Sequence, residues 1–247
     1  MNRFKSYLLF LFTLILTATL FISCSDSDSK ASSIPFPEKF HGTWVETGIN
    51  NSDLGADTLI IDIDKNTFEV RGYAFTNQVF AYKFVLTAQN DDTFFLKNIE
   101  QMEGEEQTWS PGYGAEEIGY KLVDDENITI TMPDEAGNIT MKKTEFKQPG
   151  ALKETWNNNT DRMDITFTEA GYTYTENGYE CSGTWNASED TIGSFDGIIR
   201  TVMTKEDGVS GLSYGSASPY KLDGNNLTIR YPDDNSPFVK DYTFTKQ

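Results

Sequence analysis

The chain has few of the residues on which most enzyme and metal chemistry depends. It contains a single histidine and two cysteines among 247 residues. Histidine-based acid–base catalysis, a Ser-His-Asp arrangement and most zinc sites all require histidine, so the sequence does not favour them. His41 precedes Gly42 where a strand is expected to begin, and we assign it no catalytic role. We therefore expect a protein that is not an enzyme and that has no catalytic residues, no cofactor and no metal.

Basic residues are also scarce. The chain has 20 Lys and Arg residues against 38 Asp and Glu residues, which gives a formal net charge of −18. This excess of negative charge argues against a nucleic-acid partner, because phosphate groups repel it. It argues equally against direct adhesion of the folded part to anionic lipid.

Long apolar runs are confined to the start of the chain. Arg3 and Lys5 form a short basic stretch, and residues 7–22 are almost all apolar, which is typical of a secretion signal. Residues 21–24 end in Ser23-Cys24 and resemble a bacterial lipobox. The resemblance implies a signal peptide over residues 1–23 and lipid on Cys24, which makes the membrane a partner. We expect a lipid-anchored protein of the cell envelope, held in the outer membrane and facing either the periplasm or the cell surface.

Cysteine usage sets a further constraint on the fold. If Cys24 carries lipid, Cys181 is the only thiol left, and an intramolecular disulfide is impossible. The folded part must then be held by its core, and we expect Cys181 to be buried and inert. Residues 24–35 comprise the lipidated Cys and a stretch rich in Ser and Asp, which predicts a flexible tether.

The remaining chain contains an internal repeat. Residues 120–134 and 220–233 share a Tyr-Lys-Leu start and a Pro-Asp end, and each is followed by a final strand-like run. Thr43-Trp44 and Thr155-Trp156 open the two copies. Four landmarks in the same order indicate duplication. We therefore predict one domain over residues 36–148 and a second over 149–247, divided at Pro149-Gly150.

Both copies have the pattern of strands and turns. Residues 58–63, 80–86, 163–168 and 172–175 are strand-like, and Asn, Asp and Gly turns recur every 8–12 residues or so. This predicts an all-β fold of two tandem, small, up-and-down antiparallel β-barrels, since closure removes unpaired sheet edges. Short helical turns are expected only at residues 37–40 and 151–154.

A family resemblance supports the barrel interpretation. Residues 40–44, Phe-His-Gly-Thr-Trp, look like the Gly-x-Trp motif that opens the first strand of lipocalins, and each unit is similar to the lipocalin-like domains of bacterial lipoproteins. The resemblance implies that Trp44 packs across the closed end of a barrel. Trp156 stands at the matching place in the second copy, where Glu154 replaces the glycine. Eight-stranded barrels have room for side chains or for one small ligand.

Two short motifs are better explained by structure than by chemistry. Residues 211–215 have the Gly-x-Ser-x-Gly pattern of a hydrolase nucleophile, but no histidine follows them, so we expect a loop. Residues 62–66 have the oxygen spacing of the start of a calcium loop without its glycine or its closing glutamate. A β-turn is expected there instead.

The strongest functional candidates lie in two glycine-bearing segments at matching places of the repeat, residues 103–114 and 208–215. Trp109, Tyr113 and Tyr214 are our candidate ligand-binding residues, because long loops on a rigid barrel often carry binding. The alternative is that these aromatic side chains fold back onto the barrel. The sequence thus predicts a non-catalytic protein that binds a small apolar ligand or a protein partner. Two other hypotheses stay open: a carbohydrate-active hydrolase with paired carboxylates, and an inhibitor or assembly factor that acts through these loops.

Overall fold

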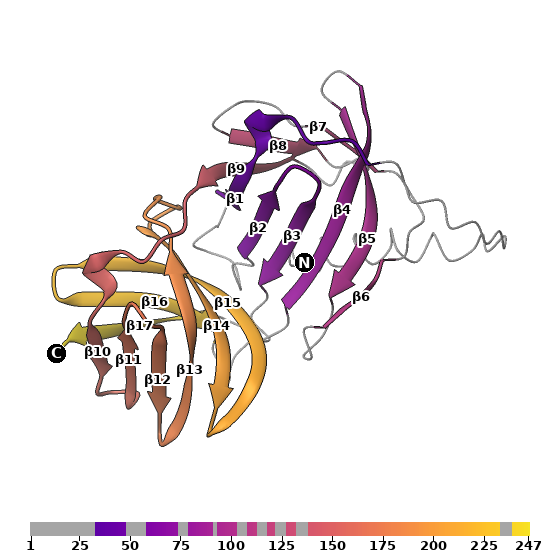
Figure 1. The fold of residues 1–247 in the computed structure, drawn as a ribbon. Coiled ribbons are helices and arrows are strands. Elements are labelled where there is room, and N and C mark those ends of the chain that lie inside the picture. The colour runs from indigo at the N-terminus through magenta and orange to yellow at the C-terminus, as the bar shows by residue number, and fades with distance from the viewer. Residues whose placement is uncertain are drawn as a thin grey trace.

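The computed structural model describes residues 33–47, 58–73, 79–90, 93–102, 108–112, 118–121, 127–131, 138–232 and 239–247. Within these ranges the fold is all-β, as the sequence predicts, with two sheets and two short 3₁₀ helices (Figure 1). The predicted signal peptide, Cys24, most of the tether and Tyr113 lie outside the described residues.

The first sheet is built by the N-terminal half of the chain, after the 3₁₀ helix η1 (Glu38–Phe40). Its strands are β1 (Gly42–Glu46), β2 (Thr58–Ile63), β3 (Phe68–Tyr73), β4 (Val79–Asn90), β5 (Thr93–Met102), β6 (Trp109–Pro111), β7 (Ile118–Lys121), β8 (Asn127–Thr131) and β9 (Asn138–Thr144). Their order is β4-β3-β2-β1-β9-β8-β7-β5-β6, and β4 also pairs with β5. The sheet therefore curls back on itself.

The second sheet is a closed barrel of eight antiparallel strands that comes after the 3₁₀ helix η2 (Gly150–Leu152). Its strands are β10 (Thr155–Asn158), β11 (Met163–Phe167), β12 (Tyr172–Glu176), β13 (Tyr179–Ala187), β14 (Gly197–Glu206), β15 (Val209–Asp223), β16 (Asn226–Pro232) and β17 (Val239–Lys246). Each strand pairs with the next along the chain, and β10 pairs with β17 to close the barrel. The prediction of an up-and-down barrel is confirmed for this half.

Alternation of side chains explains the strands. In β11, Met163, Ile165 and Phe167 are buried while the two residues between them are only partly covered. Strand side chains point alternately to the two faces of a sheet, so period-two sequence produces one core face. The strands predicted at residues 58–63, 80–86, 163–168 and 172–175 are all present, and η1 and η2 overlap the helical turns predicted at 37–40 and 151–154.

The first strand of each sheet begins with the same hydrogen bond, from a tryptophan indole to the 3₁₀ helix before it. The indole N–H of Trp44 donates to the carbonyl of Phe40 at 2.9 Å, and the indole N–H of Trp156 donates to the carbonyl of Leu152 at 3.1 Å. In each case the acceptor is the last residue of the 3₁₀ helix, four positions earlier. Both tryptophans are buried. Each 3₁₀ helix is thereby fastened over one end of its sheet.

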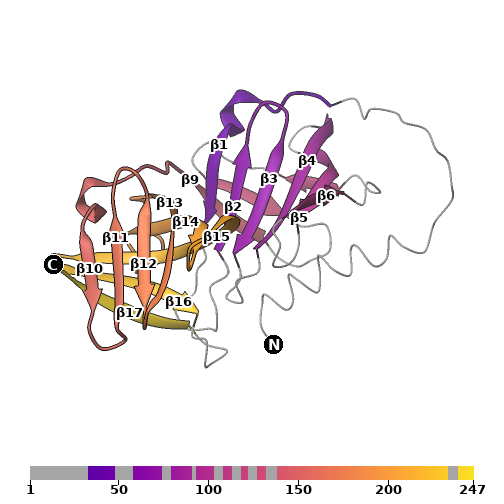
Figure 2. The same ribbon diagram turned by 60° about the horizontal axis from the view of Figure 1, so that its bottom comes forward.

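The two sheets contact each other through a separate apolar cluster. Val45, Ile60, Ala81 and Met102, from the outer face of the first sheet, are buried with Ile192 and Ile198 of the C-terminal half. The view in Figure 2 places β15 beside β2 and β3, in agreement with the contacts of β15 with β3 and β4. Burial of this outer face explains why these positions are apolar in the sequence.

The structure corrects one loop prediction and a short part of the other. Residues 209–223 are one long strand, β15, so the Gly-x-Ser-x-Gly segment lies within a sheet and not in a loop. Trp109 lies on the short strand β6, which pairs with the end of β5. In the first sheet, β5 pairs with β6 near one end and with β7 near the other. In the barrel, β14 pairs with the single long strand β15 over the same stretch. The two strands β6 and β7 therefore take the place that β15 has in the barrel. Gly211 and Gly215 made β15 look like a loop in the sequence, and residues 103–107 and 113–114 of the other predicted loop lie outside the described residues.

Trp156→Phe should lower the stability of the barrel by about 0.5–1.5 kcal/mol, since it removes the indole hydrogen bond to the Leu152 carbonyl, which then keeps only the Glu154 N–H as a donor. Urea unfolding of the full chain followed by circular dichroism measures this. The control is Trp109→Phe, which removes the same indole from a partly exposed side chain and should have a smaller effect. Equal unfolding midpoints for the two variants would contradict the role of the Trp156 hydrogen bond.

Candidate functional site

The interior of the C-terminal barrel has two unlike ends. At the end covered by η2, large side chains fill the space: Trp156, Phe167, Trp185 and Phe244 are all buried, and Phe167 packs on Trp185 with ring centroids 4.7 Å apart. The indole of Trp185 donates to the carbonyl of Thr168 at 2.8 Å. The barrel interior at this end is therefore filled by side chains.

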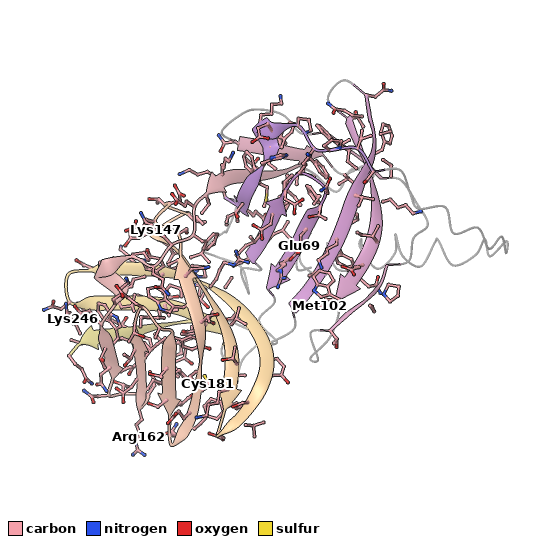
Figure 3. All side chains as sticks on the ribbon, in the orientation of Figure 1. Glu69, Met102, Lys147, Arg162, Cys181 and Lys246 are labelled. Atoms are coloured by element: carbon pink, nitrogen blue, oxygen red, sulfur yellow. The ribbon has the colours of Figure 1, made fainter. Side chains whose placement is uncertain are left out.

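The other half of the barrel contains a cavity of about 230 Å³. Figure 3 shows Cys181, one of its lining residues, toward the end marked by Arg162. The lining residues come from every strand of the barrel except β10: Met163, Ile165, Tyr172, Tyr174, Glu176, Cys181, Thr201, Ser216, Tyr231 and Tyr242. Four tyrosines and one carboxylate in a single small cavity make it the candidate functional site.

Strand register brings these residues together. Ile165 lies directly opposite Tyr174, and Tyr174 lies opposite Cys181, across β11, β12 and β13. Thr201 lies opposite Ser216, and their hydroxyls are 2.6 Å apart. Residues directly opposite each other in an antiparallel pair share a face of the sheet. The interior face of this half of the barrel therefore combines phenol and hydroxyl groups with apolar side chains, the Cys181 thiol and the Glu176 carboxylate.

Two tyrosine hydroxyls are held by carboxylates. The Tyr174 hydroxyl donates to Glu176 Oε2 at 2.7 Å within β12. The Tyr179 hydroxyl donates to Glu206 Oε1, also at 2.7 Å, across β13 and β14. Hydrogen bonds to an ionised acceptor are stronger than neutral ones, so they fix the positions of both rings. Glu176 lines the cavity itself.

Burial keeps the phenols neutral. It raises the pKa of Tyr172, Tyr174 and Tyr231 well above the usual value for tyrosine, and the hydrogen bond to Glu176 raises that of Tyr174 further. Burial likewise raises the pKa of the Cys181 thiol; the hydrogen bond with Tyr172 opposes this shift, and the negative charge of Glu206 adds to it. The cavity therefore offers neutral donors, a neutral thiol and one carboxylate.

A lysine lies on one of the cavity tyrosines. The ammonium of Lys240 is 4.3 Å from the ring centroid of Tyr242 and 3.0 Å from Asp161 Oδ1. Lys240 is directly opposite Tyr231 in the sheet, which places it on the interior face at the end of β17. A cation thus already binds a tyrosine ring and a carboxylate at this end of the barrel.

Trp109, a predicted ligand-binding residue, lies elsewhere. Its ring lies against the first sheet, with its centroid 3.7 Å from the ammonium of Lys83 and 5.9 Å from the guanidinium of Arg71. It also packs against the apolar cluster between the two sheets. Of the two interpretations that the sequence leaves open for Trp109, the structure favours an aromatic side chain that folds back onto the sheet.

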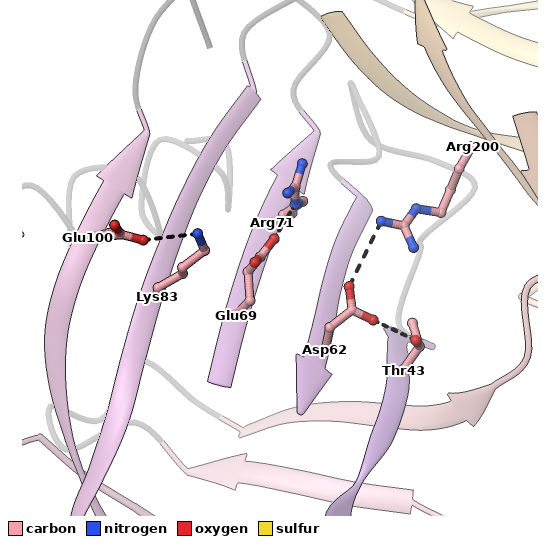
Figure 4. A network of polar contacts seen from close by, with 7 residues as sticks. All are labelled: Thr43, Asp62, Glu69, Arg71, Lys83, Glu100 and Arg200. Atoms are coloured by element: carbon pink, nitrogen blue, oxygen red, sulfur yellow. Dashed lines mark hydrogen bonds and ion pairs between the residues drawn. The ribbon is translucent and has the colours of Figure 1, made fainter. Parts of the chain in front are cut away.

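The surface around Trp109 is a row of charges. Asp62, Glu69, Lys83 and Glu100 are directly opposite one another on β2, β3, β4 and β5 (Figure 4). Glu69 pairs with Arg71, Lys83 pairs with Glu100 at 2.9 Å, and Arg200 of the barrel approaches Asp62 to 3.9 Å. Each carboxylate in the row has a cation beside it. We interpret this row as part of the contact between the two sheets.

The other predicted residues lie at several places in the fold. Tyr214 is directly opposite Met203 on β15 and shares its face with Ser216, so it belongs to the interior face but is not among the cavity residues. Trp44 and Trp156 lie at the ends of their sheets beneath η1 and η2. Cys24 and Tyr113 lie outside the described residues.

The calcium-like motif and the single histidine have structural explanations. Asp64 forms the predicted turn, since its Oδ1 accepts the backbone N–H groups of Asn66 and Thr67, both at 2.7 Å. Burial alone would raise the pKa of Asp64, but these hydrogen bonds together hold it below its usual value. His41 has Nε2 3.0 Å from the carbonyl of Phe36 and Nδ1 3.2 Å from Glu38.

The sequence-based predictions did not include the cavity tyrosines. Their signal is present, because Tyr172, Tyr174 and Glu176 alternate along one strand, as do Tyr231 and Ile229 on another. Alternation shows that residues share a face. It does not show which strands meet across a barrel or whether their side chains fill the space between them.

Within the described ranges, no cluster of three or more His, Cys, Asp or Glu side chains could hold a metal ion. In that same part of the chain, no helix is both long enough and apolar enough to cross a membrane. No protein-family model matches the chain, and no curated protein matches it.

The titration of Cys181 tests the cavity environment. In the full chain with Cys24→Ser, the alkylation rate with iodoacetamide should rise with pH at a midpoint above that of the same chain in urea, because burial disfavours the reactive thiolate. Tyr172→Phe removes a hydrogen-bond partner that lowers the pKa of the thiol, so the midpoint should rise further. A folded midpoint at or below the unfolded one would contradict a buried cavity thiol.

Proposed function

We propose that this protein is a lipid-anchored binding protein of the cell envelope that holds a small molecule in its C-terminal barrel and performs no catalysis. The cavity of about 230 Å³ is the observation that carries the proposal. Small-molecule sites are concave, largely preformed and lined by apolar and aromatic groups with a few polar ones. The four tyrosines, Met163 and Ile165 supply the apolar part, and Glu176 supplies the orienting polar group.

The closed end makes the barrel suitable for binding. Trp156, Trp185 and Phe167 leave no room beneath η2, so a ligand has one part of the interior to occupy. The hydrogen bonds of Tyr174 and Tyr179 hold their rings in place before a ligand arrives. Preorganisation of this kind lowers the entropy lost on binding.

The proposal also concerns the relationship between the two sheets. We infer that the first sheet is a diverged second copy of the lipocalin-like barrel. The support is the shared Trp-to-3₁₀ hydrogen bond, the pairing of each first strand with the last strand of its unit, and the return of β4 to β5. We assign the binding role to the C-terminal barrel, because its cavity is lined by the four tyrosines and Glu176.

The alternatives have less support. A glycoside hydrolase needs two carboxylates that face the same substrate. Among the residues that line the cavity, Glu176 is the only carboxylate, and the opposed Asp62 and Glu69 of the first sheet have Arg200 and Arg71 beside them. A partner-binding loop would need Trp109 to project from the protein, whereas its ring lies against Lys83.

Thr201→Phe tests the binding proposal, because it places a ring in the cavity. Small molecules released by denaturing the protein purified from its native envelope should be present at about one per chain in the wild type and absent from the variant. The control is Thr243→Phe, the same change at an exposed position of β17, which should retain the ligand. Overpacking costs about 1–3 kcal/mol, so thermal melting must show that both variants fold. Identical small-molecule profiles for all three proteins would contradict the proposal.

The anchor is tested separately. Cells that express the wild-type chain and take up radiolabelled palmitate should incorporate label into the protein, and Cys24→Ala should abolish this because the thiol that forms the lipid bond is gone. Cys181→Ala serves as the matched control and should leave labelling unchanged. Label retained in Cys24→Ala would overturn the anchor and the envelope location together.

A further inference from the structure

We propose that the ligand of the C-terminal barrel is a small organic cation, whose ammonium group lies over the cavity tyrosines and pairs with Glu176. This inference rests on the proposed binding function and specifies the chemistry of its ligand. It differs from the apolar ligand that the sequence suggests.

The charge inside the cavity favours a cation. Glu176 is the only charged side chain among the ten that line it, so no lysine or arginine of the lining neutralises it. A carboxylate can accept about four hydrogen bonds, and Tyr174 takes one position on Oε2. A ligand that brings an ammonium group would pair with the charge of Glu176, whereas an anionic ligand would meet repulsion.

The aromatic lining favours a cation as well. Tyr172, Tyr174, Tyr231 and Tyr242 come from three different strands and surround one small volume. The faces of aromatic rings carry partial negative charge and attract cations that lie within about 6 Å of the ring centroid. Since burial keeps the phenols of Tyr172, Tyr174 and Tyr231 protonated, the rings remain neutral donors, and Glu176 supplies the charge. Several tyrosines around one carboxylate form a cage for an ammonium group.

The protein itself contains a cation that contacts both a cavity tyrosine ring and a carboxylate. Lys240 places its ammonium 4.3 Å from the Tyr242 ring centroid and 3.0 Å from the Asp161 carboxylate. One ring of the cavity therefore already binds a cation that is neutralised by a nearby acid. Tyr174 and Glu176 repeat the ring-and-carboxylate pair elsewhere on the interior face.

The size of the cavity limits the ligand. A volume of about 230 Å³ has room for roughly seven water molecules at about 30 Å³ each. This accommodates a primary or quaternary ammonium group with a short substituent, and it is too small for a whole long acyl chain. The ammonium could belong to a free amine or to a lipid headgroup, since both present the same chemistry.

Calorimetric titration of the full chain in maltoside detergent tests the proposal with choline, with ethanolamine and with 3,3-dimethylbutan-1-ol, the uncharged carbon isostere of choline. At least one of the two cations should bind about tenfold or more tightly than the isostere. Glu176→Gln should weaken that binding by about tenfold and leave the isostere unaffected. Glu180→Gln is the matched control, because Glu180 is exposed on β13 next to the cavity residue Cys181, and it should behave as wild type.

A soluble short-chain lipid, dihexanoylphosphatidylcholine, identifies the source of the ammonium. Glu176-dependent displacement of choline by this lipid supports a headgroup ligand, and choline binding without displacement supports a free amine. Equal affinity for the isostere and the cations, unchanged by Glu176→Gln, would overturn the cation proposal while leaving the binding function intact. Absence of binding by both cations would also overturn it, and the ligand profile of Thr201→Phe then decides the binding function by itself.

Discussion

The hydrogen bond from the Trp156 indole to the Leu152 carbonyl is the interaction on which the architecture of the barrel depends. It fastens η2 over one end and directs the bulk of Trp156 into the interior, where Phe167, Trp185 and Phe244 complete the packing. Eight strands enclose a volume that side chains can just fill. Because the largest side chains lie at one end, the space that they do not fill lies at the other, and the cavity results from this unequal distribution.

The first sheet uses the same fastening, from Trp44 to Phe40, but has a different surface. Its outer face is apolar at Val45, Ile60 and Met102, where Ile192 and Ile198 cover it, and charged in the next cross-strand row. Here the outer face of the first sheet is shaped to contact the C-terminal barrel, and the barrel contains the cavity.

Much of the fold was predictable, and most of the site was not. Period-two alternation identified the strands at residues 80–86 and 163–168, and the repeated Thr-Trp landmarks located both capped ends. Gly211 and Gly215 led to a wrong loop prediction inside β15, because glycine in a strand looks like a loop in the sequence. The cavity residues come from strands β11 to β17, and only the register places Tyr174 opposite Cys181 or Thr201 opposite Ser216.

The proposed function requires a bound molecule in the cavity of the barrel half remote from η2. A high-resolution crystal structure of the protein isolated from its native envelope tests this most directly. We predict ordered density in the space between Glu176, Tyr174 and Tyr242, within hydrogen-bonding distance of the Glu176 carboxylate. A cavity filled by inward rotation of the four tyrosines, with no space left at Glu176, would contradict it.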